Sequence, residues 1–268
     1  MTLLNIYLLV LTILLGLAVG SFLNVVIYRL PKNMSLASPP SHCTSCNYQL
    51  RWFDNIPLFS YIFLRGRCRK CGEKISIRYP LIELANMVLW FACLTIFTDV
   101  IIKSNANDYV MFAVSCLACS TLVCVFFCDL DNMEIPDEFQ TILLILGLAS
   151  IFSNYVTVYE RVIGFFVGGG FFALIYYTFL LIRKKEGLGW GDVKLMAVTG
   201  LILGFKSTIL AILIASVFGS IILLILSLVK KEGANKEYPF AVFLVPACIT
   251  ALFFGQIIIN WYMSLFGV

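Results

Sequence analysis

Long hydrophobic runs separated by short polar links are the dominant pattern in this chain of 268 residues. A transmembrane helix needs about 20 consecutive, mostly apolar residues. The segment 193–205 is too short to cross alone, so we expect a partial span supported by neighbouring helices, ending at the polar pair Lys206-Ser207. The pattern predicts an all-α polytopic membrane protein with about eight transmembrane helices. The segments are 3–28, 81–102, 109–128, 139–157, 160–182, 193–205, 207–229 and 240–263.

Composition agrees with this fold class, because 61% of the residues are hydrophobic and 13% are charged. A soluble domain is nearer half apolar and a quarter charged.

The first segment could be read as a signal peptide, since Ala18-Val19-Gly20 has the small residues of a cleavage site. No basic residue precedes it, however, and its apolar run is too long. We therefore expect a retained helix with Gly16 and Gly20 on one packing face.

Basic residues are distributed unevenly among the polar links, and Lys and Arg concentrate on the cytoplasmic side of membrane proteins. With eight spans, alternate links hold 16 of the 19 basic residues. Both chain termini are therefore expected outside and residues 29–80 in the cytoplasm. The net charge of +4 follows from this topology and does not indicate nucleic-acid binding. The rich links run from Arg29 to Arg78, Arg183 to Lys194 and Lys230 to Lys236, and the poor links hold Lys103, Arg161 and Lys206.

Residues 31–80 form the one extended polar stretch, and this stretch contains two C-x2-C pairs separated by 21 residues. That spacing is close to the zinc-ribbon pattern, in which four thiolates bind a structural Zn²⁺ tetrahedrally. The alternative is disulfides or free thiols, but a reducing cytoplasm disfavours disulfides. We expect a first transmembrane helix (1–30), a small cytoplasmic zinc-ribbon-like domain (31–80) and a membrane-embedded helical domain (81–268). The expected metal ligands are Cys43, Cys46, Cys68 and Cys71.

The remaining cysteines and the single histidine narrow the chemistry. Six cysteines lie inside hydrophobic segments, where a small buried apolar role is expected even for the C-x2-C pair of Cys116 and Cys119. His42 is the one histidine, and a single histidine excludes the H-E-x-x-H zinc proteases, whose motif needs two. His42 itself is expected to face solvent. No Walker motif is present, and no G-x-G-x-x-G follows a predicted strand. Among proteolytic chemistries, an aspartate pair is the one that the sequence supports well.

Two aspartates lie where expected helices meet the cytoplasm. Asp129 follows the third hydrophobic segment, and Asp192 ends Gly187-Leu188-Gly189-Trp190-Gly191-Asp192. Carboxylates near hydrocarbon are costly, so residues placed there are functional candidates. A simple helix cap is the alternative for Asp192, but the three glycines before it would allow close approach of a substrate or positive φ. Together the two aspartates predict a carboxylate dyad that transfers protons.

The other acidic residues of the link after Asp129 are expected to be solvated or to begin the next helix. If the third helix continues, Asp131 lies about 200° from Asp129 around its axis and cannot share its direction. Pro136 suits the start of the next helix, and acidic side chains suit the positive end of its dipole. The residues expected to be solvated or to begin the next helix are Asp131, Glu134, Asp137 and Glu138.

The chain resembles the bacterial type IV prepilin peptidases, which belong to the G-x-G-D intramembrane aspartyl proteases. The resemblance covers nearly the whole chain and places the family's catalytic aspartates on Asp129 and Asp192. Thr44, in place of a usual proline, and Ala241-Val242, in place of Gly-Pro, depart from the family pattern. The motifs that carry it are residues 20–31, both cysteine pairs, 54–57, 65–68, 78–80, Glu83, 129–137 and 186–195.

The resemblance implies an enzyme of the bacterial cytoplasmic membrane, in contact with lipids, that acts on prepilin-like proteins. It would cut at the cytoplasmic face, after the glycine that ends a short basic leader. Family members of this long form also methylate the new N-terminus with S-adenosylmethionine, for which the sequence shows no recognisable site. One alternative is a peptidase without methyl transfer. Another is a non-enzymatic zinc-binding scaffold or transporter, which leaves Asp129 and the glycine-rich loop of Asp192 without a role.

Overall fold

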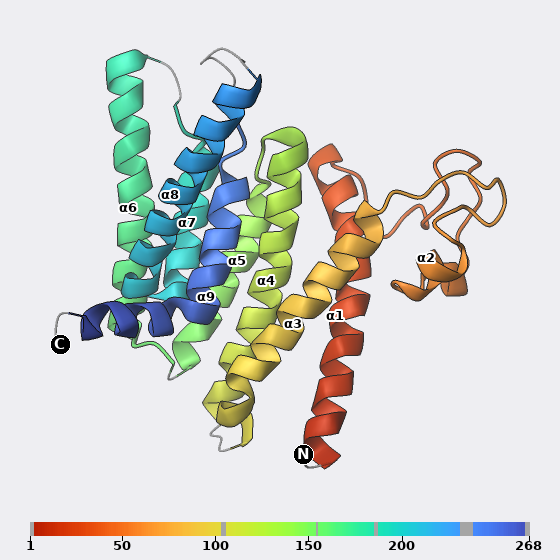
Figure 1. The fold of residues 1–268 in the computed structure, drawn as a ribbon, viewed down its shortest axis with the longest axis horizontal. Helices are drawn as coiled ribbons and strands as arrows, with labels where there is room; N and C mark the ends of the chain where they lie inside the picture. The colour runs from red at the N-terminus through yellow and green to blue at the C-terminus, as the bar shows by residue number, and fades with distance from the viewer. Residues whose placement is uncertain (1–2, 103–105, 154, 185–186, 231–237, 266–268) are drawn as a thin grey trace. The chain divides into compact units, whose positions relative to one another are not determined.

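A computed structural model describes residues 3–102, 106–153, 155–184, 187–230 and 238–265 (Figure 1). Within these ranges the regular structure is entirely helical, which confirms the predicted fold class. The elements are α1 (Leu3–Arg29), η1 (Leu30–Lys32), η2 (Trp52–Asn55), α2 (Phe59–Phe63), α3 (Arg78–Ile102), α4 (Ala106–Asn132), α5 (Asp137–Ala149), η3 (Ser150–Phe152), α6 (Val158–Arg183), α7 (Trp190–Leu203), α8 (Phe205–Lys230) and α9 (Ala241–Ser264). Several residues used in the sequence argument lie outside the described ranges, namely Lys103, Lys185, Glu186, Lys231 and Lys236.

The chain divides into two compact units, residues 1–98 and 99–268. In the first unit α1 packs closely against α3, as the spacing of Gly16 and Gly20 predicts. A Cβ atom at Gly20 would lie 2.8 Å from the Cα atom of Glu83, so a larger residue would push the helices apart. The side-chain amide of Asn86, which is buried, donates a hydrogen bond of 2.7 Å to the Gly16 carbonyl. Polar contact therefore accompanies close backbone approach here.

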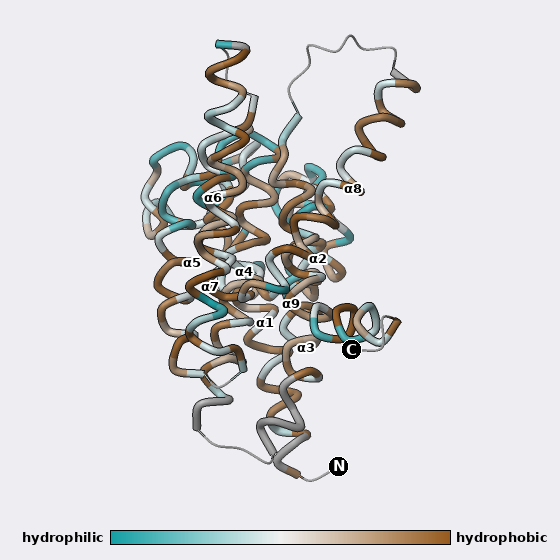
Figure 2. Tube along the Cα trace, turned by 90° about the vertical axis from the view of Figure 1, so that its left-hand side faces the viewer, coloured by the Kyte–Doolittle hydropathy of each residue, from teal (hydrophilic) through white to brown (hydrophobic). Residues whose placement is uncertain are grey.

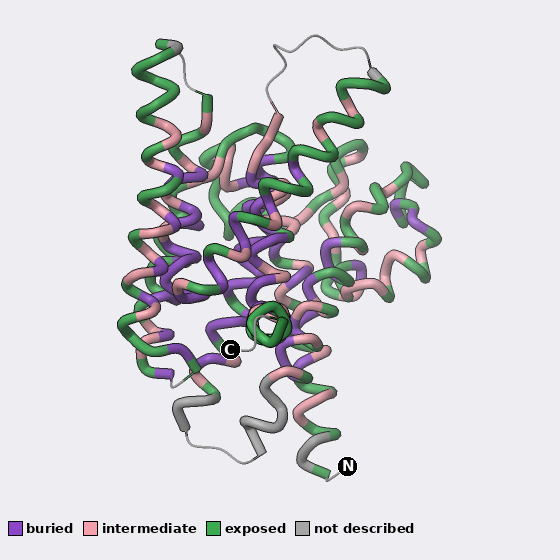
Figure 3. Tube along the Cα trace, turned by 60° about the vertical axis from the view of Figure 1, so that its left-hand side comes forward, coloured by how far each residue is buried: buried purple, intermediate pink, exposed green. Residues whose placement is uncertain are grey.

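The second unit is a helical bundle whose interior is formed mainly by α4, α5, α7 and α9. Buried residues gather along these helices, whereas α6 and α8 keep long exposed faces (Figure 3). Those faces are apolar, as the brown colour along both helices shows (Figure 2). Exposed apolar faces of this length suit contact with lipid rather than water.

Six described helices are long and apolar enough to span a membrane: α1, α3, α4, α6, α8 and α9. The other two expected segments are helical but shorter. In the segment 139–157 the α-helix ends at Ala149, so α5 has 13 residues and rises about 20 Å. The helix α7 has 14 residues, ten of which are buried, so protein surrounds it along most of its length. This agrees with a partial span supported by its neighbours.

The boundary between α7 and α8 lies at Gly204 rather than at Lys206-Ser207. Gly204 has a φ of +77°, and its N–H donates to the carbonyl of Gly200. A residue in this conformation ends a helix, and glycine adopts it without steric cost. Backbone conformation, rather than the polar pair that follows, therefore separates the two helices.

The contact between α6 and α7 depends on glycine. A Cβ atom at Gly164 would overlap the carbonyl oxygen of Gly200, and one at Gly168 would overlap the carbonyl oxygen of Met196. We expect Gly164→Ala to lower the free energy of unfolding by about 1–3 kcal/mol, because overpacking forces the helices apart. Thermal unfolding of the purified protein measures the change.

Gly170→Ala is the matched control, because Gly170 lies on the same helix and a Cβ atom there meets nothing within 4 Å. That variant should be at least as stable as the parent, since alanine favours helix over glycine by about 0.5–1 kcal/mol. Equal melting temperatures for Gly164→Ala and Gly170→Ala would contradict close packing of α6 on α7.

Candidate active site

Asp129 lies in the last turn of α4, which continues past it to Asn132. Its side chain is buried, whereas Asp131 is exposed, in agreement with the angle expected between them. The backbone N–H groups of Ala241 and Val242, in the first turn of α9, hydrogen-bond to the Asp129 carboxylate. Backbone donors at a helix N-terminus favour the ionised form of a carboxylate.

Asp192 lies in the first turn of α7, where Gly189 is the N-cap residue. The carboxylate is buried and accepts a hydrogen bond from the Gly189 backbone N–H. This contact resembles that of a helix cap, which was the alternative role considered for Asp192. It leaves one carboxylate oxygen, Oδ1, buried without a hydrogen-bond partner.

The glycines before Asp192 let the loop pack against its own protein. A Cβ atom at Gly187 would collide with the ring of Phe179, and one at Gly191 would lie 3.2 Å from the Cβ atom of Ile135. The φ angle of Gly189 is −68°, and Gly187 and Gly191 are not among the described residues with positive φ. Gly187 and Gly191 therefore allow neighbouring side chains to pack closely against the loop, and neither needs an unusual backbone conformation.

The two aspartates interact electrostatically although 63 residues separate them in the chain. Burial and, after it, the negative charge of Asp129 raise the pKa of Asp192 to about 7. Each carboxylate also has one buried oxygen without a partner, Oδ2 of Asp129 and Oδ1 of Asp192. Two carboxylates in such a site share a proton, because both cannot ionise readily. This arrangement can perform acid–base chemistry near neutral pH.

Gln140 is a residue near the site that the sequence reasoning missed. Its side chain is buried on α5, and its Nε2 donates to the carbonyl oxygen of Gly191 at 3.4 Å. Its Oε1 is buried without a partner. The one signal in the sequence is an amide within the apolar run 139–149, and an isolated polar residue in such a run does not indicate what it contacts.

The remaining acidic residues of the 131–138 link are exposed, as expected. Pro136 is the N-cap of α5, and Asp137 and Glu138 lie in its first turn. Asp137 forms an ion pair of 2.8 Å with Lys194 on α7. This exposed pair connects the starts of the two short helices, and such pairs contribute little to stability.

The four predicted metal ligands come together in the first unit. Their Sγ atoms all lie within 4.8 Å of one another. The Sγ atoms of Cys43 and Cys71 are 3.9 Å apart, as are those of Cys46 and Cys68. Four sulfurs at about 2.3 Å from a tetrahedral zinc ion would be separated by nearly this distance. The cluster could therefore hold Zn²⁺, and four thiolates leave no open coordination position.

Each cysteine pair belongs to the same kind of tight turn. The N–H of Cys43 donates to the Tyr48 carbonyl, and the N–H of Cys68 donates to the Glu73 carbonyl. The residue after each pair, Asn47 or Gly72, has positive φ, a conformation that asparagine and glycine adopt most readily. His42 is exposed and lies outside the cluster, as predicted.

An ion pair ties η2 to the second cysteine turn. Arg69 Nε lies 2.7 Å from Asp54 Oδ1, and the Tyr48 hydroxyl donates to Asp54 Oδ2 at 3.2 Å. Burial alone would raise the pKa of Asp54, but hydrogen bonds and the charge of Arg69 lower it. Asp54 therefore stays ionised and holds the loop around the cluster.

Comparison with known proteins gives matches over most of the chain. Residues 14–97 match the model of the bacterial peptidase A24 N-terminal domain, and residues 116–224 match that of the type IV leader peptidase family. No solved structure matches the chain.

Three similar proteins are named prepilin leader peptidase/N-methyltransferase. The protein of Aeromonas salmonicida strain A449 is 34% identical over 280 residues, covering 95% of this chain and 93% of the relative. That of Pseudomonas putida is 32% identical over 284 residues, covering 97% and 96%. That of Pseudomonas aeruginosa PAO1 is 33% identical over 285 residues, covering 96% and 93%.

Proposed function

This chain belongs to the type IV leader peptidase family, and from that premise we propose that Asp129 and Asp192 are its catalytic pair. The enzyme is then an intramembrane aspartyl endopeptidase. The observation that supports this most directly is that the Asp129 charge acts on Asp192 while each carboxylate keeps one buried oxygen unpaired. A water molecule and a peptide carbonyl could use these oxygens. Because the chain belongs to a peptidase family, the alternative of a non-enzymatic scaffold is no longer needed.

The proposed mechanism assigns a different role to each aspartate. We assign the ionised state to Asp129, because the N–H groups of Ala241 and Val242 favour its charged form against the effect of burial, and it takes a proton from the attacking water. Asp192 starts protonated and donates to the carbonyl oxygen as the water oxygen bonds to the carbonyl carbon. When the C–N bond breaks, the proton held by Asp129 passes to the leaving amine, and one hydroxyl of the diol intermediate returns its proton to Asp192 as the carbonyl forms again.

The proposed substrate is a prepilin-like protein with a short basic leader before an apolar helix. Cleavage would follow the glycine that ends the leader and would take place at the cytoplasmic face of the bacterial inner membrane. The excess of Lys and Arg in alternate links supports this side for the zinc-binding loop and both aspartates. With eight membrane-crossing segments, the same pattern supports a topology with both termini outside.

The second proposed activity is methylation of the new N-terminus, in keeping with the names of the relatives. S-adenosylmethionine, when bound, supplies the methyl group. We assign the zinc cluster a structural role, because its four thiolates would complete the coordination of a zinc ion and leave none for chemistry. We propose a division into a first helix (1–30), a zinc-binding domain (31–80) and a peptidase domain (81–268), in which the four-cysteine cluster supports the second part.

The experiment that tests both activities measures the mass of the product. Purified enzyme is incubated with a prepilin, with and without S-adenosylmethionine. We expect loss of the leader in both reactions and the added mass of one methyl group only with the donor. Leader loss without methylation would support a peptidase alone, and an intact prepilin in both reactions would reject the proposed function.

The pH dependence of cleavage tests the assignment of the proton to Asp192. A carboxyl with a pKa raised to about 7 is protonated below that pH and loses its proton as the pH rises through it. We therefore expect kcat/KM for leader cleavage to fall as the pH rises above about 7. Thermal unfolding at each pH is the control, since ionising a buried carboxyl also lowers folded-state stability in that range. A rate that stays constant through mildly alkaline pH, with stability unchanged, would contradict the assignment.

A further inference from the structure

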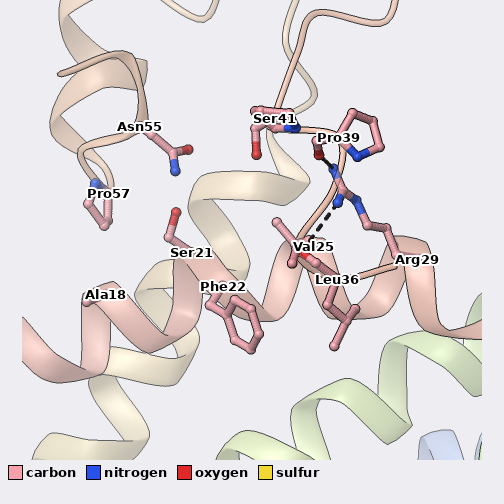
Figure 4. Close-up of a pocket in the computed structure, with 12 residues that line it drawn as sticks. Ala18, Ser21, Phe22, Val25, Arg29, Leu36, Pro39, Ser41, Asn55 and Pro57 are labelled. Atoms are coloured by element: carbon pink, nitrogen blue, oxygen red, sulfur yellow. Dashed lines mark hydrogen bonds between the residues drawn. The ribbon is translucent and has the colours of Figure 1, made fainter. Parts of the chain in front are cut away.

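A cavity of about 370 Å³ lies in the first unit, between α1 and two parts of the zinc-binding loop (Figure 4). The one charged residue that lines it is Arg29. Its guanidinium already donates to the backbone carbonyls of Ser35 at 2.9 Å, Leu36 at 3.4 Å and Pro39 at 2.6 Å. Arg29 therefore holds this part of the loop against the end of α1. The evidence for a further binding surface lies in the second unit.

Three aromatic rings meet at the start of α7, close in the chain to Asp192. Trp190 precedes Asp192 by two residues. The centroid of its ring lies 5.2 Å from that of Tyr176 and 6.1 Å from that of Tyr177, both on α6. Trp190 is 42% exposed and Tyr177 is 53% exposed. The three rings therefore pack together and still present apolar surface.

A second group of rings adjoins the backbone amides that hold Asp129. Phe240 is the N-cap residue of α9 and directly precedes Ala241, whose N–H binds the Asp129 carboxylate. The centroid of the Phe240 ring lies 6.0 Å from that of Phe172 on α6. Phe172 and Tyr176 are four residues apart, so they lie on the same face of that helix. One face of α6 therefore contacts both groups of rings.

These residues form a surface that we call the aromatic row: Phe172, Tyr176 and Tyr177 of α6, Trp190 of α7 and Phe240 of α9. Tryptophan and tyrosine also gather at membrane–water interfaces, where they contact lipid headgroups. An interface belt needs only exposed rings, whereas the aromatic row includes the buried Phe172 and packs against the starts of α7 and α9. Aromatic rings bury a large apolar area, and the exposed side of α6 is apolar, so a membrane helix can reach it from the lipid (Figure 2). The aromatic row therefore suits an apolar segment of a membrane protein that lies beside the two aspartates.

We propose that the aromatic row binds the apolar side chains that directly follow the cleavage point of the substrate. The proposal rests on the proposed function and names the surface that holds this part of the substrate. The enzyme has to place the scissile peptide at Asp129 and Asp192 while the apolar helix after it stays in the membrane. Trp190 and Tyr177 have exposed ring surface beside the start of α7, so they are the residues expected to contact the substrate.

The first test is photocrosslinking, which does not depend on cleavage. Tyr177→p-benzoylphenylalanine is made in full-length protein that also carries Asp192→Asn, so that the substrate stays intact. The protein is reconstituted with a prepilin in vesicles of phosphatidylethanolamine and phosphatidylglycerol and is then irradiated. We expect a crosslink to the residues directly after the leader, identified by mass spectrometry.

Tyr159→p-benzoylphenylalanine is the matched control for this experiment. Tyr159 is 74% exposed on the same helix but lies about 27 Å from Tyr177 along the helix axis. It should give no crosslink to the residues directly after the leader.

The second test measures cleavage. Tyr177→Ala should lower kcat/KM for leader removal about five- to tenfold, mainly through a higher KM, because the loss of an aromatic contact weakens binding by about that factor. Tyr159→Ala should cleave at the parent rate. A prepilin with alanine in place of the first apolar residues after the cleavage point should be cleaved nearly equally by Tyr177→Ala and by the parent, since the contact is absent in both.

A crosslink from position 177 to lipid but not to prepilin would show that the aromatic row belongs to the membrane interface and would overturn the proposal. A crosslink of equal yield from position 159 to the same segment would also overturn it, as would an equal loss of kcat/KM in Tyr177→Ala for both prepilins. Failure of the proposed function gives a different result, because the parent protein would then leave every prepilin intact.

Discussion

Replacing either Asp129 or Asp192 with asparagine should lower the rate of leader cleavage by about a thousandfold or more. Asparagine has nearly the same size as aspartate but can neither take a proton from water nor give one to the carbonyl oxygen. General acid–base catalysis typically contributes about 10²–10⁴-fold to a rate, and both roles depend on the same pair. Cleavage of a purified prepilin under single-turnover conditions measures the effect.

Asp131→Asn is the matched control, because Asp131 lies two residues after Asp129 but is exposed. That variant should cleave at nearly the parent rate. Membrane insertion and thermal unfolding should remain normal in Asp129→Asn and Asp192→Asn, since asparagine has nearly the same size as aspartate and adds no buried charge. Substantial cleavage by either purified variant would remove the pair from the mechanism.

The second large effect is expected at the cysteine cluster. Replacing Cys43 and Cys46 together with serine should abolish zinc binding and leave residues 31–80 open to proteolysis. A structural zinc ion contributes about 10 kcal/mol or more to the folding of a small domain. The described part of this loop has few buried side chains, Cys68 and Asp54 among them, so it has little core of its own. Metal analysis and limited proteolysis measure the two consequences.

The chain provides its own control for this experiment. Cys116 and Cys119 have the same C-x2-C spacing but are buried on α4 and are not part of the four-cysteine cluster. Serine at both positions should leave one zinc ion per chain and the same proteolysis pattern as the parent. Zinc retained after replacement of Cys43 and Cys46 would show that the metal binds elsewhere.

The glycine-rich loop shows that residues can serve a different purpose from the one that the sequence suggests. The three glycines before Asp192 indicated a special site, and their expected use was approach by a substrate. In the structure Gly187 and Gly191 pack against Phe179 and Ile135. The loop therefore needs small residues to be held in place within the protein, and this requirement could not be separated from substrate approach in the sequence.

Local features of the sequence were sufficient to predict the helices and the cysteine turns, and they marked the two aspartates as candidates. Each of these features is determined by residues that are close together in the chain. The features are hydrophobic runs, basic links, C-x2-C spacing and a carboxylate beside an apolar segment. The end of α5 at Ala149 and the break at Gly204 needed the structure, because apolar composition continues through both.

The relation between Asp129 and Asp192 was decided only by tertiary structure. Their separation in the chain says nothing about distance in space, and the packing of α4, α5, α7 and α9 sets which groups surround each carboxylate. The same packing places the start of α9 at Asp129 and Gln140 at Gly191. Long-range contacts of this kind depend on many side chains at once, whereas the tendency to form each helix depends on its own residues.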